Sequence, residues 1–194
     1  MRKRLLLASA AFAGVGLAAV AAVPEDLIVK LREPTMTMSP ADLQAVARRL
    51  SQDVGVPLLG VRATSGDELV LSVDRGALGE RLLAAARAMP GVTAAEMTVP
   101  GAAVPQLEIA LQPAAGSGLT DPSRLASVSE RLARATGAPL EARIESGRII
   151  VRANADELLG DVSRRLQALP EVTYAQPNLV FRIRPPDEAV RKPL

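Results

Sequence analysis

The sequence contains an internal repeat. Eight residues recur 82 positions later, and five further residues recur 80 positions later. The first set is Pro40, Leu43, Val46, Arg49, Leu50, Gly55, Pro57 and Leu58, repeated as Pro122, Leu125, Val128, Arg131, Leu132, Gly137, Pro139 and Leu140. The second set is Leu78, Pro90, Val92, Thr93 and Ala95, repeated as Leu158, Pro170, Val172, Thr173 and Ala175. Two copies of one folding unit are therefore expected.

Each copy begins with the pattern of a strand followed by a helix. Residues 27–31 and 107–111 place aliphatic side chains on one face at a period of two, which predicts strands. Ser39-Pro40 and Asp121-Pro122 follow, and a Ser or Asp N-cap before proline predicts the start of a helix. A glycine stands at the expected end of each helix, at Gly55 and Gly137.

A hairpin, a second helix and a closing strand complete each copy. In the second copy, Ser146-Gly147 marks the hairpin turn and residues 148–153 form the return strand. Leucine and valine side chains spaced by three and four predict a helix that ends before Pro170, and residues 172–176 form the last strand. We therefore expect an α+β fold of two tandem ferredoxin-like β-α-β-β-α-β modules. Each has an antiparallel four-stranded sheet with two helices on one face.

The face of each predicted sheet that carries no helix differs between the copies. In the second copy we expect charged side chains there, including Glu108, Arg143 and Arg152. In the first copy the face is more apolar and includes Ile28 and Val70. This apolar face either packs against the second copy, which we favour, or binds a partner.

The repeat also predicts the organisation of the chain. We expect the modules at residues 25–99 and 106–181, joined by a Pro/Gly-rich linker at residues 100–105. Residues 182–194 contain two adjacent prolines and several charges, which is typical of an extended tail.

Residues 1–21 have the pattern of a signal peptide. A basic run at residues 2–4 precedes an apolar stretch, and Ala19-Val20-Ala21 is a small-x-small cleavage pattern. We expect a secreted or periplasmic protein cleaved near Ala21; an uncleaved anchor is the alternative and would be its only link to a membrane. Removing three basic residues leaves 20 Lys and Arg against 21 Asp and Glu, a net charge of −1. That balance argues against binding to nucleic acid.

Composition limits the chemistry that the chain can perform. There is no cysteine and no histidine. A thiolate nucleophile, a His-based metal site and a Ser-His-Asp triad are therefore excluded. We expect a protein that is not an enzyme and that uses no cofactor and no metal.

The end of the second copy carries the most specific motif. Residues 169–181 read Leu-Pro-Glu-Val-Thr-Tyr-Ala-Gln-Pro-Asn-Leu-Val-Phe. This run resembles the last strand of the propeptides of subtilisin-like serine proteases, with Gln176 in place of the usual glutamate. Residues 27–31 resemble the start of such a propeptide. The first copy lacks the closing motif and has Ala-Ala-Glu-Met at residues 94–97 instead.

The resemblance implies a non-catalytic protein that inhibits a subtilisin-like serine protease, assists its folding, or both. Propeptides of this family pack their sheet on surface helices of the protease and lay the C-terminal segment in the active-site cleft. Such a segment adds as a strand to the substrate-binding edge. The residues implied in protease binding are Tyr174, Pro177, Asn178, Leu179, Val180, Phe181, Arg182, Ile183 and Arg184.

Other interpretations of these residues stay open. Tyr174 could be a core residue of the last strand, Pro177-Asn178 could only end that strand, and Leu179 and Phe181 could complete the core. Two other functions are also open. The chain could be the pro-region of a protease precursor whose catalytic domain is missing from it, or a ferredoxin-like envelope binding or assembly protein unrelated to proteases.

Overall fold

The computed structural model describes residues 26–33, 38–98 and 107–178. In these residues the fold is α+β, with two four-stranded antiparallel sheets and four helices, as the repeat predicted. The elements of the first repeat are β1 (Asp26–Leu31), α1 (Pro40–Val54), β2 (Leu58–Ala63), β3 (Glu68–Val73), α2 (Arg75–Arg87) and β4 (Val92–Met97). Those of the second are β5 (Leu107–Pro113), α3 (Pro122–Thr136), β6 (Glu141–Glu145), β7 (Arg148–Ala153), α4 (Ala155–Gln167) and β8 (Val172–Pro177).

The predicted boundaries of the first helix in each repeat are confirmed. Ser39 caps α1 in a capping box with Asp42, in which each side chain bonds the backbone N–H of the other residue. Asp121 caps α3 by accepting a hydrogen bond from the Ser123 N–H at 3.0 Å. Gly55 and Gly137 end these helices with φ values of 76° and 74°, in the left-handed region that glycine adopts without strain.

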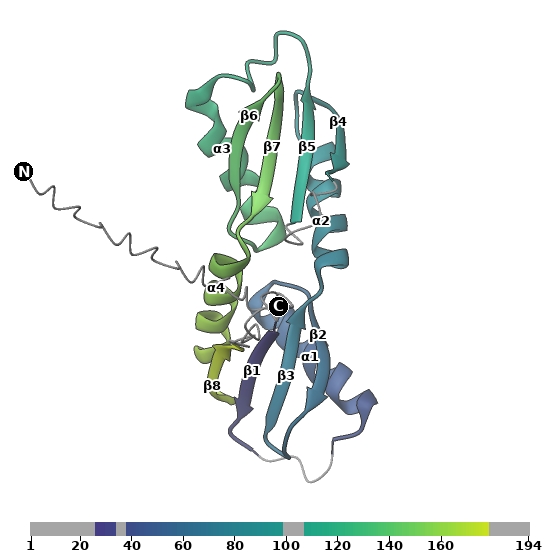
Figure 1. Ribbon diagram of the computed structural model, residues 1–194, viewed down its shortest axis with the longest axis vertical. Helices are drawn as coiled ribbons and strands as arrows, with labels where there is room; N and C mark the ends of the chain where they lie inside the picture. The colour runs from purple at the N-terminus through teal and green to yellow at the C-terminus, as the bar shows by residue number, and fades with distance from the viewer. Residues whose placement is uncertain (1–25, 34–37, 99–106, 179–194) are drawn as a thin grey trace, which may run out of the picture. The chain divides into compact units, whose positions relative to one another are not determined.

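Each sheet takes three strands from one repeat and its fourth strand from the other. The first sheet has the order β2-β3-β1-β8, and the second has the order β4-β5-β7-β6. Val29 of β1 lies opposite Ala175 of β8, and Leu111 of β5 lies opposite Ala95 of β4. Figure 1 shows the result for the first sheet, where the yellow-green strand β8 lies beside the purple strand β1.

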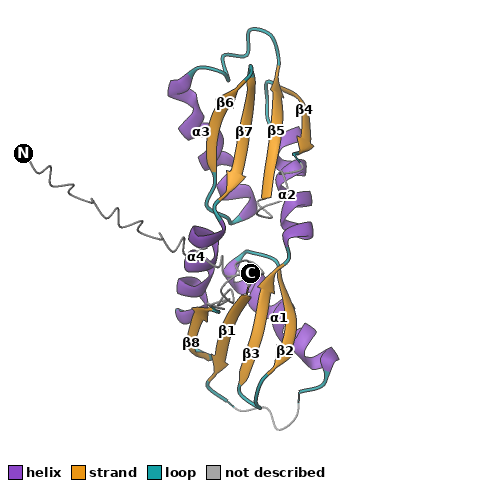
Figure 2. Ribbon diagram, in the orientation of Figure 1, coloured by secondary structure: helices purple, strands orange, loops and turns teal. Residues whose placement is uncertain are grey.

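The second helix of each repeat packs on the same sheet as the closing strand of that repeat. Helix α4 contacts β8 and β1, and helix α2 contacts β4 and β5 (Figure 2). Helices α1 and α3 stay with their own repeats, against β2 and β6. The repeats therefore exchange a helix-strand unit, and the expectation that residues 25–99 and 106–181 each close their own sheet is wrong.

The connection between the third strand and the second helix gives a physical reason for the exchange. Only Asp74 lies between β3 and α2, and only Asn154 lies between β7 and α4. Both residues cap the helix that follows, accepting hydrogen bonds from the N–H groups of Ala77 and Asp156. Strand-to-helix loops usually contain roughly two to six residues. A connection of one residue is too short to fold the helix back onto the sheet it has just left.

The core is aliphatic and draws on both repeats. Fully buried side chains such as Leu27, Leu82, Ile109 and Leu166 belong to one contiguous cluster of apolar residues. Burying one such side chain contributes about 1.5–3 kcal/mol relative to leaving it exposed. Since the exchanged helices supply part of this cluster, separating the repeats would expose it.

Three of the predicted segments fall outside the residues that the structure describes. These are the signal peptide at residues 1–21, the linker at residues 100–105 and the tail at residues 182–194. Among the helices of the described ranges, none has the length and apolar character needed to cross a bilayer.

Candidate functional site

The closing motif of the second repeat lies in the first sheet. Residues 172–177 form β8 at the edge of that sheet, beside β1. Pro177 is the last strand residue, and the N–H of Asn178 still donates to the carbonyl of Asp26 at 2.8 Å. The chain therefore leaves the first sheet at a defined point next to the start of β1. The other residues implied in protease binding, Leu179, Val180, Phe181, Arg182, Ile183 and Arg184, lie outside the described residues.

One face of the first sheet is turned away from the helices. Alternate residues of β1 show this, because Leu27 and Val29 are fully buried while Ile28 and Lys30 are only half-buried. The strand register places Ile28 between Val70 and Gln176, and Lys30 between Glu68 and Tyr174. We call this surface the open face. Its residues are Asp26, Ile28, Lys30, Leu59, Arg62, Glu68, Val70, Ser72, Tyr174 and Gln176.

The apolar part of the open face runs toward the outer strand β2. Val70 is buried and Ile28 is half-buried, but Leu59 is 44% exposed. Val61, at the bulge of β2 between Gly60 and Arg62, is 49% exposed. Adjacent exposed apolar side chains of this kind mark interaction surfaces more often than isolated ones do.

The second repeat joins the first sheet at its edge and on its helix side. Strand β8 extends the edge beyond β1, and helix α4 contacts β1 and β8. The expectation that the apolar face of the first repeat packs against the second repeat is therefore not met by the described elements. The exchange of helix and strand supplies the contact between the repeats instead.

The polar part of the open face is organised around Glu68. The hydroxyl of Tyr174 donates a hydrogen bond to one carboxylate oxygen, and the hydroxyl of Thr64 donates to the other at 2.7 Å. These two bonds, that of Tyr174 first, lower the pKa of Glu68 from its usual value. The same bond raises the pKa of Tyr174. Tyr174 is thus fixed on a half-exposed surface and is not a core residue.

A salt bridge lies beside this cluster. Lys30 of β1 reaches Asp67, the residue before β3, with 3.2 Å between its Nζ and a carboxylate oxygen. The hydrogen bond from Ser65, and then the one from Lys30, lower the pKa of Asp67. Glu68 and Asp67 are therefore ionised over the neutral pH range, and the open face combines an apolar strip with fixed polar groups.

Two backbone positions on the outer edge of β8 are not available to a further strand. The carbonyl of Ala175 accepts hydrogen bonds from Ser163, at 2.7 Å, and from Gln167, both on α4. Pro177 has no N–H to donate. A proline and an occupied carbonyl both disfavour the addition of a further strand at this end of β8. A partner would therefore meet the open face or the chain after Asn178 more readily than this edge.

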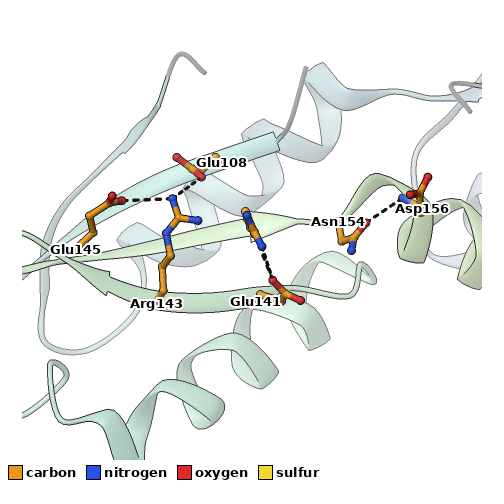
Figure 3. A network of polar contacts seen from close by, with 7 residues as sticks. Glu108, Glu141, Arg143, Glu145, Asn154 and Asp156 are labelled. Carbon is orange, nitrogen blue, oxygen red and sulfur yellow. Dashed lines mark hydrogen bonds and ion pairs between the residues drawn. The ribbon is translucent and has the colours of Figure 1, made fainter. Parts of the chain in front are cut away.

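The equivalent face of the second sheet is charged, as the sequence predicted. Figure 3 shows Arg143 between Glu108 and Glu145, at nitrogen-to-oxygen distances of 3.4 and 3.3 Å. Arg152 pairs with Glu141 at 3.0 Å. Exposed pairs like these contribute roughly 0–1 kcal/mol each to stability. Charged pairs dominate this surface, whereas the open face combines its paired charges with the apolar side chains of Ile28, Leu59 and Val70.

The described ranges hold no group of three or more His, Cys, Asp or Glu side chains arranged to bind a metal ion. We compared the chain with protein-family models, with curated proteins and with solved structures, and none matched.

Sequence reasoning missed the pairing of Tyr174 with Glu68. It placed the two residues in separate modules, whereas the exchange brings them onto one sheet. The sequence feature that could have indicated the exchange is the one-residue connection from the third strand to the second helix, at Asp74 and Asn154.

Proposed function

We propose that this chain is an exported, non-catalytic protein that binds a subtilisin-like serine protease, inhibiting it, assisting its folding, or both. In this proposal the open face rests on the protease surface. The segment after Asn178, from Leu179 to Arg184, occupies the substrate cleft. The observation that carries the proposal is the closing motif at residues 169–181.

The geometry supports this assignment because it joins two features that the sequence had placed in different modules. The closing motif ends β8, and β8 is hydrogen-bonded into the sheet that carries Ile28, Val70 and Leu59. A protease that bound the open face would therefore meet the start of the tail at the same sheet. Residues 179–184 can span roughly 20 Å when extended, enough for several substrate subsites.

We also assign each sheet, with its two helices, to the ferredoxin-like arrangement. The strand order β2-β3-β1-β8 corresponds to that arrangement when β8 takes the place of the fourth strand. The order β4-β5-β7-β6 corresponds in the same way, with β4 as the exchanged strand. Two ferredoxin-like units with exchanged closing elements are consistent with the propeptide resemblance.

An inhibition assay tests the proposal. Purified residues 22–194 should inhibit at least one subtilisin-type protease with a Kd in the micromolar range or tighter, which corresponds to roughly 8 kcal/mol or more of binding free energy. Refolding of the denatured protease should also be measured with and without the protein. If several enzymes of this class are neither inhibited nor refolded faster, the proposal is wrong.

A further inference from the structure

A cleft lies between helix α3 and the turn that joins α2 to β4. Its volume is about 550 Å³. The turn comes from the first repeat and the helix from the second, so the exchange of elements creates it. Its lining residues are Met89, Pro90, Gly91, Ser117, Leu119, Arg124, Ser127, Val128 and Arg131. We call it the arginine cleft.

Two arginine side chains give the cleft its charge. Arg124 and Arg131 are seven residues apart on α3, so they lie on the same face of the helix, with Val128 between them. Both are exposed. Within the described residues, neither guanidinium group forms an ion pair or a hydrogen bond. The nearby carboxylate of Asp121 accepts hydrogen bonds from Ser123 at the helix cap, and these bonds first, then the charge of Arg124, lower the pKa of Asp121.

The internal repeat provides a comparison for this charge. Arg49 of α1 is the counterpart of Arg131, and Glu171 is the counterpart of Gly91. Arg49 and Glu171 form an ion pair, with 4.0 Å between the Arg49 Nε and a carboxylate oxygen of Glu171. In the arginine cleft the acidic residue is replaced by glycine, so Arg131 lacks the partner that its counterpart has.

The second arginine strengthens the contrast. Arg124 is the counterpart of Asp42, whose carboxylate is held by Ser39 in the capping box of α1. The acidic residue Asp42 is thus replaced by the basic residue Arg124, and the acidic residue Glu171 is replaced by Gly91. With the two capping residues included, the equivalent groups carry a net charge of −1 at Ser39, Asp42, Arg49 and Glu171, but +1 at Asp121, Arg124, Arg131 and Gly91.

We propose that the arginine cleft binds an acidic segment of a partner polypeptide. A glutamate or aspartate of the partner supplies the carboxylate that Glu171 supplies in the other half. Guanidinium groups bind carboxylates in a forked geometry that makes strong, charge-assisted hydrogen bonds. The adjacent apolar residue of the partner packs against Met89, Leu119 and Val128, which form the apolar lining. This site is separate from the open face and does not depend on the protease proposal.

Two properties of the cleft favour a peptide over a small inorganic anion. Its volume lies within the roughly 300–1,000 Å³ that is typical of ligand clefts and exceeds what one anion fills. The lining also combines buried apolar side chains, at Met89 and Val128, with the hydroxyl of Ser127. A ligand that uses both kinds of surface needs a carboxylate beside an apolar side chain.

The test is an NMR titration of the purified protein with a short capped peptide in which one glutamate is flanked by leucines. We expect saturable shifts of the Arg124 and Arg131 side-chain signals and of the backbone at Met89 to Gly91. Arg131→Gln and Arg124→Gln should each weaken binding roughly tenfold, because each removes a charge-assisted bond. Arg134→Gln, an equal loss of charge at an exposed position of α3 outside the cleft, should have little effect.

Matched ligands decide what the cleft recognises. The same peptide with glutamine in place of glutamate should bind at least tenfold more weakly, and inorganic phosphate alone should compete poorly. The proposal is overturned if the glutamine peptide binds equally well, if Arg134→Gln weakens binding as much as Arg131→Gln, or if phosphate matches the acidic peptide. Absence of any saturable shift up to millimolar peptide also overturns it.

Discussion

The hydroxyl of Tyr174, in the last strand of the second repeat, donates a hydrogen bond to the carboxylate of Glu68, in the third strand of the first repeat. The bond passes over β1, because Lys30 lies opposite both residues in the sheet register. It links the two repeats through side chains on the open face. It also fixes the one aromatic residue of the closing motif that the structure describes.

Replacing Tyr174 by phenylalanine should change how stability depends on pH. The folded-state pKa of Glu68 is lowered from its ordinary value of 4.5, chiefly by Tyr174, so this bond stabilises the fold above pH 4.5. Its contribution is lost as the pH falls through the lowered pKa. Melting temperatures should therefore be higher for the wild type than for Tyr174→Phe at pH 7, and the difference should shrink in acid.

The pKa of Glu68 gives a second readout of the same variant. Carboxyl NMR signals followed through an acid titration should show a higher pKa for Glu68 in Tyr174→Phe than in the wild type. A Glu68 pKa that is identical in the two proteins would mean that the bond does not form in solution.

Cutting the chain between the repeats tests the exchange of elements. A protease site inserted within residues 100–105 allows cleavage of the folded protein. The two fragments should stay together as a 1:1 complex in size-exclusion chromatography, because each supplies a helix and a strand to the sheet of the other.

Refolding the fragments separately provides the control. Each fragment alone lacks the fourth strand of its sheet, so circular dichroism should show cooperative melting only after the fragments are mixed. Two fragments that separate as folded monomers would contradict the exchange and restore the tandem arrangement at residues 25–99 and 106–181.

A pair of matched glycine substitutions tests the contact between the ends of α1 and α3. Both Gly55 and Gly137 have positive φ, which costs an alanine about 1–2 kcal/mol. A Cβ on Gly137 would also lie 2.7 Å from the carbonyl oxygen of Gly55, whereas a Cβ on Gly55 meets nothing within 4 Å. Gly137→Ala should therefore destabilise the fold by roughly 1–3 kcal/mol more than Gly55→Ala, since overpacking adds to the strain. Equal losses in chemical denaturation would show that the two helix ends do not touch.

Much of the local structure follows from the sequence, because it depends on neighbouring residues. The proline and the capping residue before each first helix, the glycine after it and the Ser146-Gly147 turn all lie where they were predicted. Each of these signals acts within a few residues, so no knowledge of the tertiary fold is needed to interpret them.

The exchange of a helix and a strand between the repeats could not be predicted in the same way. The residues that meet across the exchange, such as Val29 with Ala175, would pair with equivalent apolar residues in either arrangement. The hydrophobic pattern is therefore the same for tandem and exchanged modules. Only the lengths of the connections distinguish them, and a connection's length follows from helix and strand boundaries that are hard to place within one residue.

A charge placed on the open face tests whether this surface binds the protease. Leu59→Glu puts a carboxylate on a side chain that is 44% exposed, so the fold should tolerate it. Inhibition of the protease should weaken roughly tenfold or more, because the charge would be desolvated in the complex. Ile144→Glu is the matched control, since Ile144 is 38% exposed on the edge strand β6 of the second sheet. If both variants inhibit as well as the wild type, the open face is not the docking surface.

Removal of the tail after Asn178 tests whether residues 179–184 occupy the substrate cleft of the protease. The shortened protein, residues 22–178, keeps β8 and the hydrogen bond from Asn178 to Asp26, so its circular dichroism and melting temperature should match those of residues 22–194. We predict that the longer protein inhibits a subtilisin-like protease and that the shortened protein has lost inhibition. A shortened protein that inhibits fully, or one that unfolds, would contradict the assignment of residues 179–184 to the substrate cleft.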